Sequence, residues 1–256
     1  MTVSLQAYLE NLEEETYELM VGTGDSNALS YGFTKKRAVH PGVSGQMIPL
    51  PMAPQKWVEL MGQEPDMSKK RMVYIHIPFC SHICLYCGFF QNFINEDREQ
   101  RYVARLLKEL EMAKEDKMLQ AKPMQCVFFG GGTPSALSPA NIAKVLQKLK
   151  ECIPLTNDCE ITMEARIYDL QKERIEAWLA NGVNRVSIGV QSFDTKIRQA
   201  SGRLDTKETV MERLKLISSY DQASIIVDII FGLPGQTLDS FMEDLACIDS
   251  LPISGM

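Results

Sequence analysis

The feature that most constrains the fold is a regular alternation of short apolar runs and longer amphipathic segments after residue 70. Runs of strand length are predicted at residues 72–77, 125–129, 159–164, 185–190 and 225–231. Helices are predicted between and after them, at residues 97–118, 139–151, 171–181, 207–219 and 238–250. This alternation predicts an α/β fold with a parallel sheet and helices outside it. A further strand is expected to begin at residues 252–254, which predicts a β/α barrel cut short near its sixth strand.

The first 70 residues follow a different pattern. They open with an acidic segment of helical character and continue into a run that is interrupted by proline between Pro41 and Pro54. We therefore expect residues 1–70 to form an N-terminal extension with one or two helices, and residues 71–256 to form the barrel. Because the sixth unit is incomplete, the sequence is expected to be a fragment of a longer protein.

Composition excludes several classes of protein. With 45% hydrophobic residues the chain can bury a sizeable core, and its net charge of -6 argues against binding to nucleic acid. Residues 1–20 are acidic where a signal peptide would be basic, and no apolar stretch reaches the length of about 18 residues that a membrane span needs. Seven cysteines in such a chain indicate thiols or metal ligands in a reducing compartment, so a cytoplasmic location is expected.

Distinctive residues gather where the predicted strands end. Cys80 follows the first strand, a glycine-rich turn at residues 130–134 follows the second, and Glu164 ends the third. Gln191 follows the fourth strand, and Asp228 lies within the fifth. Because parallel strands bring their carboxyl ends to one edge of a sheet, we expect these residues to form one site.

A cluster of three cysteines provides the clearest chemical prediction. Cys80, Cys84 and Cys87 have the spacing C-x3-C-x2-C, so one loop can turn three thiolates toward a common centre. A [4Fe-4S] cluster is normally held by four thiolates, and three would leave one iron open to an external ligand. The alternative is a zinc site completed by His82 or Cys126, but zinc sites more often have a second C-x2-C pair, and none is present. The remaining cysteines have no matching spacing and are predicted to be structural: Cys126, Cys152, Cys159 and Cys247.

Several longer motifs resemble one family. The segments are residues 74–80, 128–134, 182–193, 202–203 and 228–237. In this order they resemble the radical S-adenosylmethionine (SAM) proteins related to oxygen-independent coproporphyrinogen III oxidase, over about residues 72 to 250. The resemblance implies a partial TIM barrel that encloses a [4Fe-4S] cluster and SAM. It also implies that an electron from a low-potential donor, such as a flavodoxin, cleaves SAM to methionine and a 5′-deoxyadenosyl radical.

The resemblance further implies a role for each SAM contact. Tyr86 corresponds to the residue near the adenine, and Tyr74 to the one near the methionine moiety. Glu164 corresponds to the carboxylate that meets the SAM amino group, and Arg203 to the cation near the SAM carboxylate, which suits a zwitterion. The other implied contacts are Gly131, Gly132 and Thr133 in the glycine-rich turn, and Gln191 and Asp228 near the nucleoside.

Two departures bear on the branch of the family. The coproporphyrinogen decarboxylases typically have a fourth cysteine two residues after the third, whereas this chain continues Cys87-Gly88-Phe89. That continuation, with the segment at residues 35–41, resembles the haem-utilisation (HutW and ChuW) branch, whose members methylate and open the haem ring anaerobically, releasing its iron. The second departure is Arg166, which follows Glu164 and Ala165 where relatives commonly have asparagine and proline.

Three functions remain open at this stage: haem ring opening with methyl transfer, oxidative decarboxylation of a porphyrinogen, and a non-enzymatic haem chaperone. A haem or related tetrapyrrole is the expected partner in each case. Two histidines are weaker candidates as haem ligands. His40 lies in a predicted loop, where a single histidine is usually surface, and His76 lies on a predicted strand, where it is expected to be structural or near the cluster.

Overall fold

The computed structural model describes residues 11–14, 16, 48–88 and 92–256. The chain divides into two units, Met1–Trp57 and Val58–Met256. Of the predicted extension, the short helix η2 (Leu50–Met52) and the helix α4 (Ala53–Met61) are described. His40 and the segment at residues 35–41 lie outside the described residues, and the boundary at residue 70 stays a prediction.

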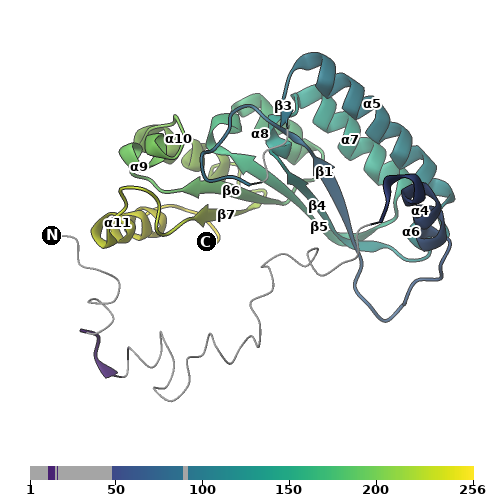
Figure 1. Ribbon diagram of the computed structural model, residues 1–256, viewed down its shortest axis with the longest axis horizontal. Coiled ribbons are helices and arrows are strands. Elements are labelled where there is room, and N and C mark those ends of the chain that lie inside the picture. Colours follow the sequence, from purple (N-terminus) through teal and green to yellow (C-terminus); the bar gives the residue numbers. More distant parts are fainter. Residues whose placement is uncertain (1–10, 15, 17–47, 89–91) are drawn as a thin grey trace. The chain divides into compact units, whose positions relative to one another are not determined.

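Five parallel strands form the central sheet in the same order as in the sequence. They are β1 (Met72–Ile77), β4 (Met124–Gly131), β5 (Leu155–Arg166), β6 (Arg185–Gln191) and β7 (Ser224–Ile229). Every neighbouring pair is parallel (Figure 1). Because the order never reverses, the sheet has no topological switch point of the doubly wound kind, and the arrangement is that of an incomplete barrel.

The alternation of buried and accessible residues explains how the sheet packs. In β1, Ile75 and Ile77 are buried, whereas Tyr74 and His76 on the other face are exposed. The buried face packs against a helical layer that includes α5 (Glu96–Met112), α7 (Pro139–Cys152) and α8 (Lys172–Ala180) (Figure 1). Trp178 of α8 is completely buried in this core. The opposite face of the sheet is therefore left for polar side chains.

Local capping explains where several helices begin. Asn95 accepts a hydrogen bond from the backbone N–H of Arg98 at the start of α5. Thr237 and Ser240 form a reciprocal capping box at the start of α11 (Leu238–Asp249). Thr206 caps α10 (Lys207–Ser218) in the same way as Asn95 caps α5. Among the described residues, none of the helices has the combination of length and apolar character that crossing a bilayer requires.

The structure differs from the predicted elements at a few places. The helix predicted to reach residue 118 ends at Met112 and continues as the turn η3 (Ala113–Glu115) and the short helix α6 (Lys117–Gln120). A six-residue helix, α9 (Thr195–Ala200), was not predicted and is capped by Asp194. β7 ends at Ile229, two residues earlier than predicted.

The outer side of β7 carries the beginning of a further pairing. Ile226 and Gly255 form an isolated parallel bridge. The backbone N–H of Val227 donates to the carbonyl of Gly255 at 3.0 Å, and that of Ser254 donates to Ile225 at 2.8 Å. The sixth strand expected at residues 252–254 therefore begins to pair in parallel with β7, next in order along the sheet.

Candidate functional site

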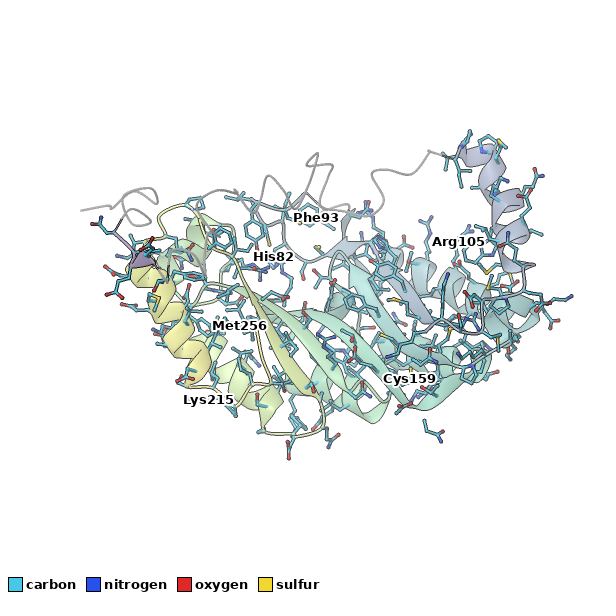
Figure 2. All side chains as sticks on the ribbon, turned by 90° about the horizontal axis from the view of Figure 1, so that it is seen from below. His82, Phe93, Arg105, Cys159, Lys215 and Met256 are labelled. Carbon is cyan, nitrogen blue, oxygen red and sulfur yellow. The ribbon has the colours of Figure 1, made fainter. Side chains whose placement is uncertain are left out.

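One cavity lies at the carboxyl ends of the strands. Its volume is about 230 Å³, and it brings together residues of the loop after β1, the glycine-rich turn at the end of β4, the C-terminal parts of β5 and β6, and β7. The predicted residues that line it are Cys80, Cys84, Tyr86, Cys87, Gly131, Gly132, Thr133, Glu164, Gln191, Arg203 and Asp228. In Figure 2, His82, which lies between the first two cysteines, and Phe93, which follows the last, are on one side of the sheet. Cys159, near the start of β5, lies away from them. The site predicted at one edge of the sheet is thus assembled in space.

The cysteine-bearing segment is anchored on both sides. The two-residue strands β2 (Phe79–Cys80) and β3 (Asn92–Phe93) pair in parallel, and the backbone N–H of Ile94 donates to the carbonyl of Cys80 at 3.0 Å. Within the segment, the N–H of Leu85 donates to the carbonyl of Ser201 at 3.1 Å. These contacts join the loop to the segment that returns after the cysteines and to the end of α9.

Two of the thiols receive hydrogen bonds from neighbouring side chains. The hydroxyl of Thr133 donates to Cys80 Sγ at 3.2 Å, and Nη2 of Arg166 donates to Cys84 Sγ at 2.7 Å. Burial raises the pKa of the Cys80 thiol, while the Thr133 hydrogen bond and the charge of Arg166 act in the opposite direction. Donors aimed at sulfur stabilise thiolates, which is the form that binds metal.

The spacing of the thiols bears on the two metal hypotheses. Among the described residues, the one group of three potential ligands within 4.8 Å of each other lies elsewhere, so Cys80, Cys84 and Cys87 are spread more widely. Three thiolates on one tetrahedral zinc ion would be about 3.8 Å apart, given a Zn–S distance of about 2.3 Å. Of the two further zinc ligands considered above, His82 lines the cavity and Cys126 does not. The donor set fits a polynuclear iron-sulfur cluster better than a single zinc ion.

The glycine-rich turn passes close to the cysteine segment. A Cβ on Gly132 would lie 2.7 to 3.0 Å from backbone atoms of Phe79, and Gly131 has a φ of +114°. A side chain at either position would collide with its surroundings or strain the backbone. The turn therefore needs glycine in order to sit beneath the first cysteine.

Substitution of Gly132 by alanine is expected to destabilise the protein by about 1–3 kcal/mol and to lower its iron content, because the new methyl group pushes Phe79 and Cys80 out of place. Urea unfolding of the metal-free protein and iron analysis after reconstitution measure the two effects. Gly255→Ala is the matched control, since its Cβ would meet only Ile226 at 3.5 Å. Equal stability of both variants would show that the turn can move aside.

Two carboxylates face the cavity, Glu164 from β5 and Asp228 from β7, the strands on either side of β6. Burial raises the pKa of Glu164, a backbone hydrogen bond from Gly131 lowers it, and the charge of Asp228 raises it again. Asp228 accepts a hydrogen bond from the hydroxyl of Ser187 at 2.9 Å. The cavity thus carries negative charge on its β5 and β7 side, suited to a cationic group such as an ammonium.

Arg203 and Tyr86 form a pair on another wall of the cavity. Nε of Arg203 donates to the Tyr86 hydroxyl at 2.8 Å, and the guanidinium carbon lies 6.0 Å from the centre of the tyrosine ring. Arg203 also donates through Nη1 to the carbonyl of Gly189. Arg203 as a residue is only 8% exposed. Its charge is therefore shielded from solvent and can hold an anion.

Gln191 adopts an unusual backbone conformation at the end of β6. Its φ is +73°, and the pairing with β7 shifts register between Gly189 and Gln191. The buried Arg198 supports this turn by donating from Nη1 to the carbonyls of Val190 and Ser192, at 2.6 and 3.1 Å. A non-glycine residue in the left-handed region costs energy and persists only where its surroundings hold it, as at many binding sites.

Tyr74 is the one predicted contact that does not line the cavity. Its ring stacks on Phe128, with centroids 6.1 Å apart, and its hydroxyl lies 3.1 Å from Nδ1 of His76. The His76 ring in turn packs against Gly131, where a Cβ would lie 2.7 Å from it. Tyr74 and His76 thus lie beside the cavity, on the open face of β1.

Five lining residues were not predicted: His82, Ala165, Arg166, Ser187 and Gly189. The signal that could have identified three of them is the two-residue period of a strand, since Arg166 follows Glu164, and Ser187 and Gly189 precede Gln191, at intervals of two. His82 lies between the cysteines and was considered only as a further ligand of a zinc ion, not as a contact of the cluster or of SAM.

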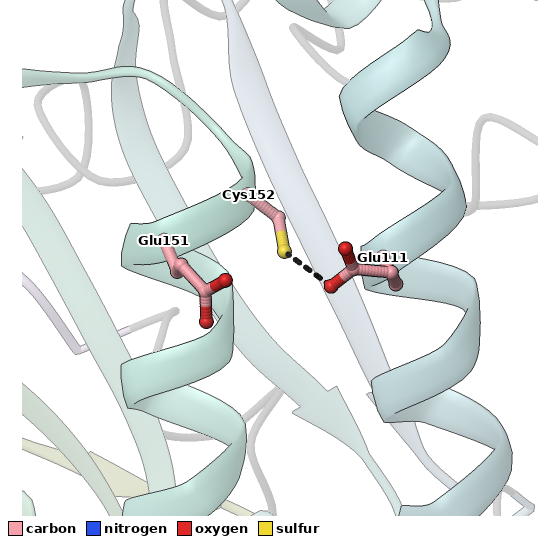
Figure 3. Close-up of side chains that lie close together, drawn as sticks. All are labelled: Glu111, Glu151 and Cys152. Carbon is pink, nitrogen blue, oxygen red and sulfur yellow. Dashed lines mark hydrogen bonds between the residues drawn. The ribbon is translucent and has the colours of Figure 1, made fainter.

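A second group of potential metal ligands lies outside the cavity, between α5 and α7. Glu111, Glu151 and Cys152 lie close together (Figure 3). Lys114 bridges the two carboxylates, at 3.0 Å from Glu111 and 2.8 Å from Glu151, and Lys148 contacts both as well. Hydrogen bonds from these lysines lower the pKa of Glu111 to about 2. The lysines supply the positive charge that a metal would bring, so this group is an exposed ion-pair network between helices.

Comparisons with known proteins agree with this geometry. The family model described as the radical SAM superfamily matches residues 74–248. The chain is 40% identical, over 88% of its own length, to anaerobilin synthase of Escherichia coli O157:H7, and it covers 50% of that protein. It is 32% identical, over 70% of its length, to the haem chaperone HemW of Lactococcus lactis, of which it covers 46%.

The fold is also found among solved structures. Coproporphyrinogen III oxidase (HemN) of Escherichia coli, described as a radical SAM enzyme, matches with a TM-score of 0.63 and 27% identity, over 76% of this chain and 44% of that one. This match confirms the predicted α/β partial barrel. The chain spans half or less of the length of each of these relatives.

Proposed function

Since this chain belongs to the radical SAM superfamily, within the HemN-like family, we propose that its cavity binds a [4Fe-4S] cluster and SAM and that the protein opens haem under anaerobic conditions. The superfamily implies both cofactors. In the proposal, Cys80, Cys84 and Cys87 hold three irons and leave the fourth to SAM. When bound, this pair of cofactors supplies one-electron cleavage of SAM.

The chain's own residues then bind and orient SAM. Glu164 faces the amino group, and Arg203 faces the carboxylate, so that the two charged ends of the amino acid are held by opposite charges. Gln191 and Asp228 face the nucleoside. In this proposal Tyr86, which accepts a hydrogen bond from Arg203, packs against the adenine. The turn at Gly131 and Gly132 lets backbone groups approach the cofactor closely.

The observation that carries the choice of substrate is the extent of the match to anaerobilin synthase. That match covers 88% of the chain, against 70% for HemW, and therefore includes part of the first 70 residues as well as the barrel. The identity is also higher, at 40% against 32% to 36% for HemW proteins. We therefore favour haem ring opening with methyl transfer and iron release, which yields a linear tetrapyrrole.

The test is to reconstitute the protein anaerobically and to supply haem, SAM and a low-potential reductant. The expected result is loss of the haem Soret absorption, a linear tetrapyrrole in the mass spectrum, and 5′-deoxyadenosine or another SAM cleavage product. Reactions that lack SAM, or that contain the Cys84→Ser variant, should leave haem intact. Intact haem in the complete reaction, although the cluster is bound and reducible, would contradict the choice of substrate.

Two other functions are supported by named relatives and are separated by the same material. The similarity to HemN favours oxidative decarboxylation, for which coproporphyrinogen should release carbon dioxide. The similarity to HemW favours a chaperone, for which haem should bind without turnover and pass to an apo-acceptor. Incubating the same preparation with each substrate decides among the three.

The affinity for SAM is expected to fall as the pH falls through the raised pKa of Glu164. Below that pKa the carboxyl is protonated and has no charge to offer an ammonium group, and above it the charge is present. Glu164→Gln should weaken SAM binding about 10- to 100-fold at neutral pH, because a charge-assisted hydrogen bond is worth about 1.5–3 kcal/mol, and should flatten the pH dependence. Equilibrium dialysis with labelled SAM measures both, and Asp158→Asn, an exposed change at the other end of β5, is the control.

A further inference from the structure

We propose that Arg166 is a positioning residue that raises the reduction potential of the cluster through its hydrogen bond to Cys84. The inference rests on the proposed binding of a [4Fe-4S] cluster by the three cysteines. It concerns the residue at which this chain departs from the glutamate-alanine-asparagine-proline pattern noted above.

Arg166 makes two hydrogen bonds to the cysteine segment. It is the last residue of β5, and its Nη1 donates to the carbonyl of His82 at 2.7 Å while its Nη2 donates to Cys84 Sγ at 2.7 Å. The planar guanidinium presents both donors in a fixed geometry, which a lysine ammonium cannot reproduce. One side chain therefore sets the backbone before Cys84 and the direction of its sulfur together.

The backbone of Arg166 is itself held in place. Its N–H donates to the hydroxyl of Ser135 at 3.3 Å, and that hydroxyl donates to the buried carboxylate of Asp169 at 2.8 Å. Ser135 is completely buried. The end of β5 is thus tied to the turn that follows the glycine-rich segment, and Arg166 extends toward the cysteines from a fixed base.

The charge of Arg166 lies next to sulfur, and it also acts on the buried carboxylate of Asp169 without forming an ion pair with it. Within the described part of the chain, no carboxylate lies within 4.0 Å of its guanidinium to form an ion pair. Cys80, by comparison, receives its hydrogen bond from the neutral hydroxyl of Thr133. Cys84 therefore receives a hydrogen bond from a cation and Cys80 one from a neutral group, so these two ligands are electrostatically unequal.

Both properties act on the cluster in the same direction. Reduction adds one negative charge to the cluster, and hydrogen bonds to its sulfurs and nearby positive charge favour the reduced form. The cavity wall shields this interaction from solvent, which strengthens it. Arg166 would allow a donor of less negative potential to reduce the cluster, and so widens the range of donors that can drive SAM cleavage.

The experiment is a redox titration of the anaerobically reconstituted protein, followed by the electron paramagnetic resonance of the reduced cluster. Arg166→Gln is expected to keep its iron and sulfide but to show a midpoint potential lower by about 59 mV or more, equivalent to about a tenfold lower ratio of reduced to oxidised cluster at a fixed potential. Arg166→Lys, which keeps the charge but not the paired geometry, should fall between this variant and the original protein.

Arg213→Gln is the matched control, because it removes one arginine whose Nη1 donates to the carbonyl of Leu170 and which does not line the cavity. Its midpoint potential should not change. A wild-type potential in Arg166→Gln with the cluster retained would overturn the inference. So would folded Arg166 variants that bind no cluster, since Arg166 would then serve assembly alone. A failure of the original protein to bind any cluster would refute the proposed function instead.

Discussion

Replacing Cys84 by serine is expected to abolish cluster binding and SAM cleavage. The change removes one of three proposed ligands, and two thiolates from one loop do not hold a [4Fe-4S] cluster that normally has four. It also removes the sulfur that accepts the hydrogen bond from Arg166. Iron and acid-labile sulfide per chain, the absorbance of the reconstituted protein near 400 nm and the yield of 5′-deoxyadenosine measure the loss.

The chain supplies its own control for this experiment. Cys126 is half-buried on β4, with its Sγ 3.9 Å from a carboxylate oxygen of Glu160, and it does not line the cavity. Cys126→Ser should therefore keep the full iron content and activity. If this variant lost its cluster while Cys84→Ser kept one, the assignment of ligands would be wrong and the zinc-type alternative with Cys126 would return.

Replacing Arg198 by glutamine is expected to destabilise the protein by about 3–5 kcal/mol, which is the typical cost of removing one partner from a buried ionic network. Arg198 is 1% exposed and donates to the carbonyls of Val190, Ser192 and Asp205 as well as to the Asp205 carboxylate. Glutamine cannot satisfy all of these acceptors. Burial lowers the pKa of Arg198 to about 10, so the side chain still carries its charge at neutral pH.

Urea unfolding of the metal-free protein measures this effect, and Lys196→Gln on the exposed face of the same helix is the control. The Arg198 variant should also bind SAM more weakly, because the left-handed backbone of Gln191 depends on the carbonyls that Arg198 holds. An unchanged midpoint in urea would mean that water can replace the guanidinium in this turn.

Most of the sheet could be predicted because each strand buries one face. β1 was predicted with its observed ends, and β6 extends one residue further than predicted, to Gln191. β5 is longer at both ends than predicted, because its first residues, among them Asn157 and Asp158, are polar and exposed and give no apolar signal. The small strands β2 and β3 could not be predicted, since two-residue strands have no periodicity and depend on the return of the chain after the cysteines.

The site could be predicted for residues whose spacing is set by metal binding, or whose backbone requires glycine. It could be predicted less well for side chains whose position depends on packing between distant parts of the chain. The cysteines and the glycine-rich turn line the cavity as expected. The contact of Arg166 with Cys84 joins residues 82 positions apart, and no local sequence pattern predicts it. Tyr74 stands beside the cavity because its ring is held by Phe128, a neighbour that only the strand register reveals.

The pairing of β2 with β3 bears on what happens to the protein when oxygen destroys its cluster. Small zinc domains unfold when they are stripped of metal because the ion is their main source of order. Here backbone hydrogen bonds join the two ends of the thiol-bearing turn, and the side chains of Phe79 and Ile94 at those ends pack in the apolar core. Oxygen that destroys the proposed iron-sulfur cluster should thus leave the cysteine-bearing loop folded. We expect such damage to be repaired by supplying iron, sulfide and reductant, with no need to refold the polypeptide.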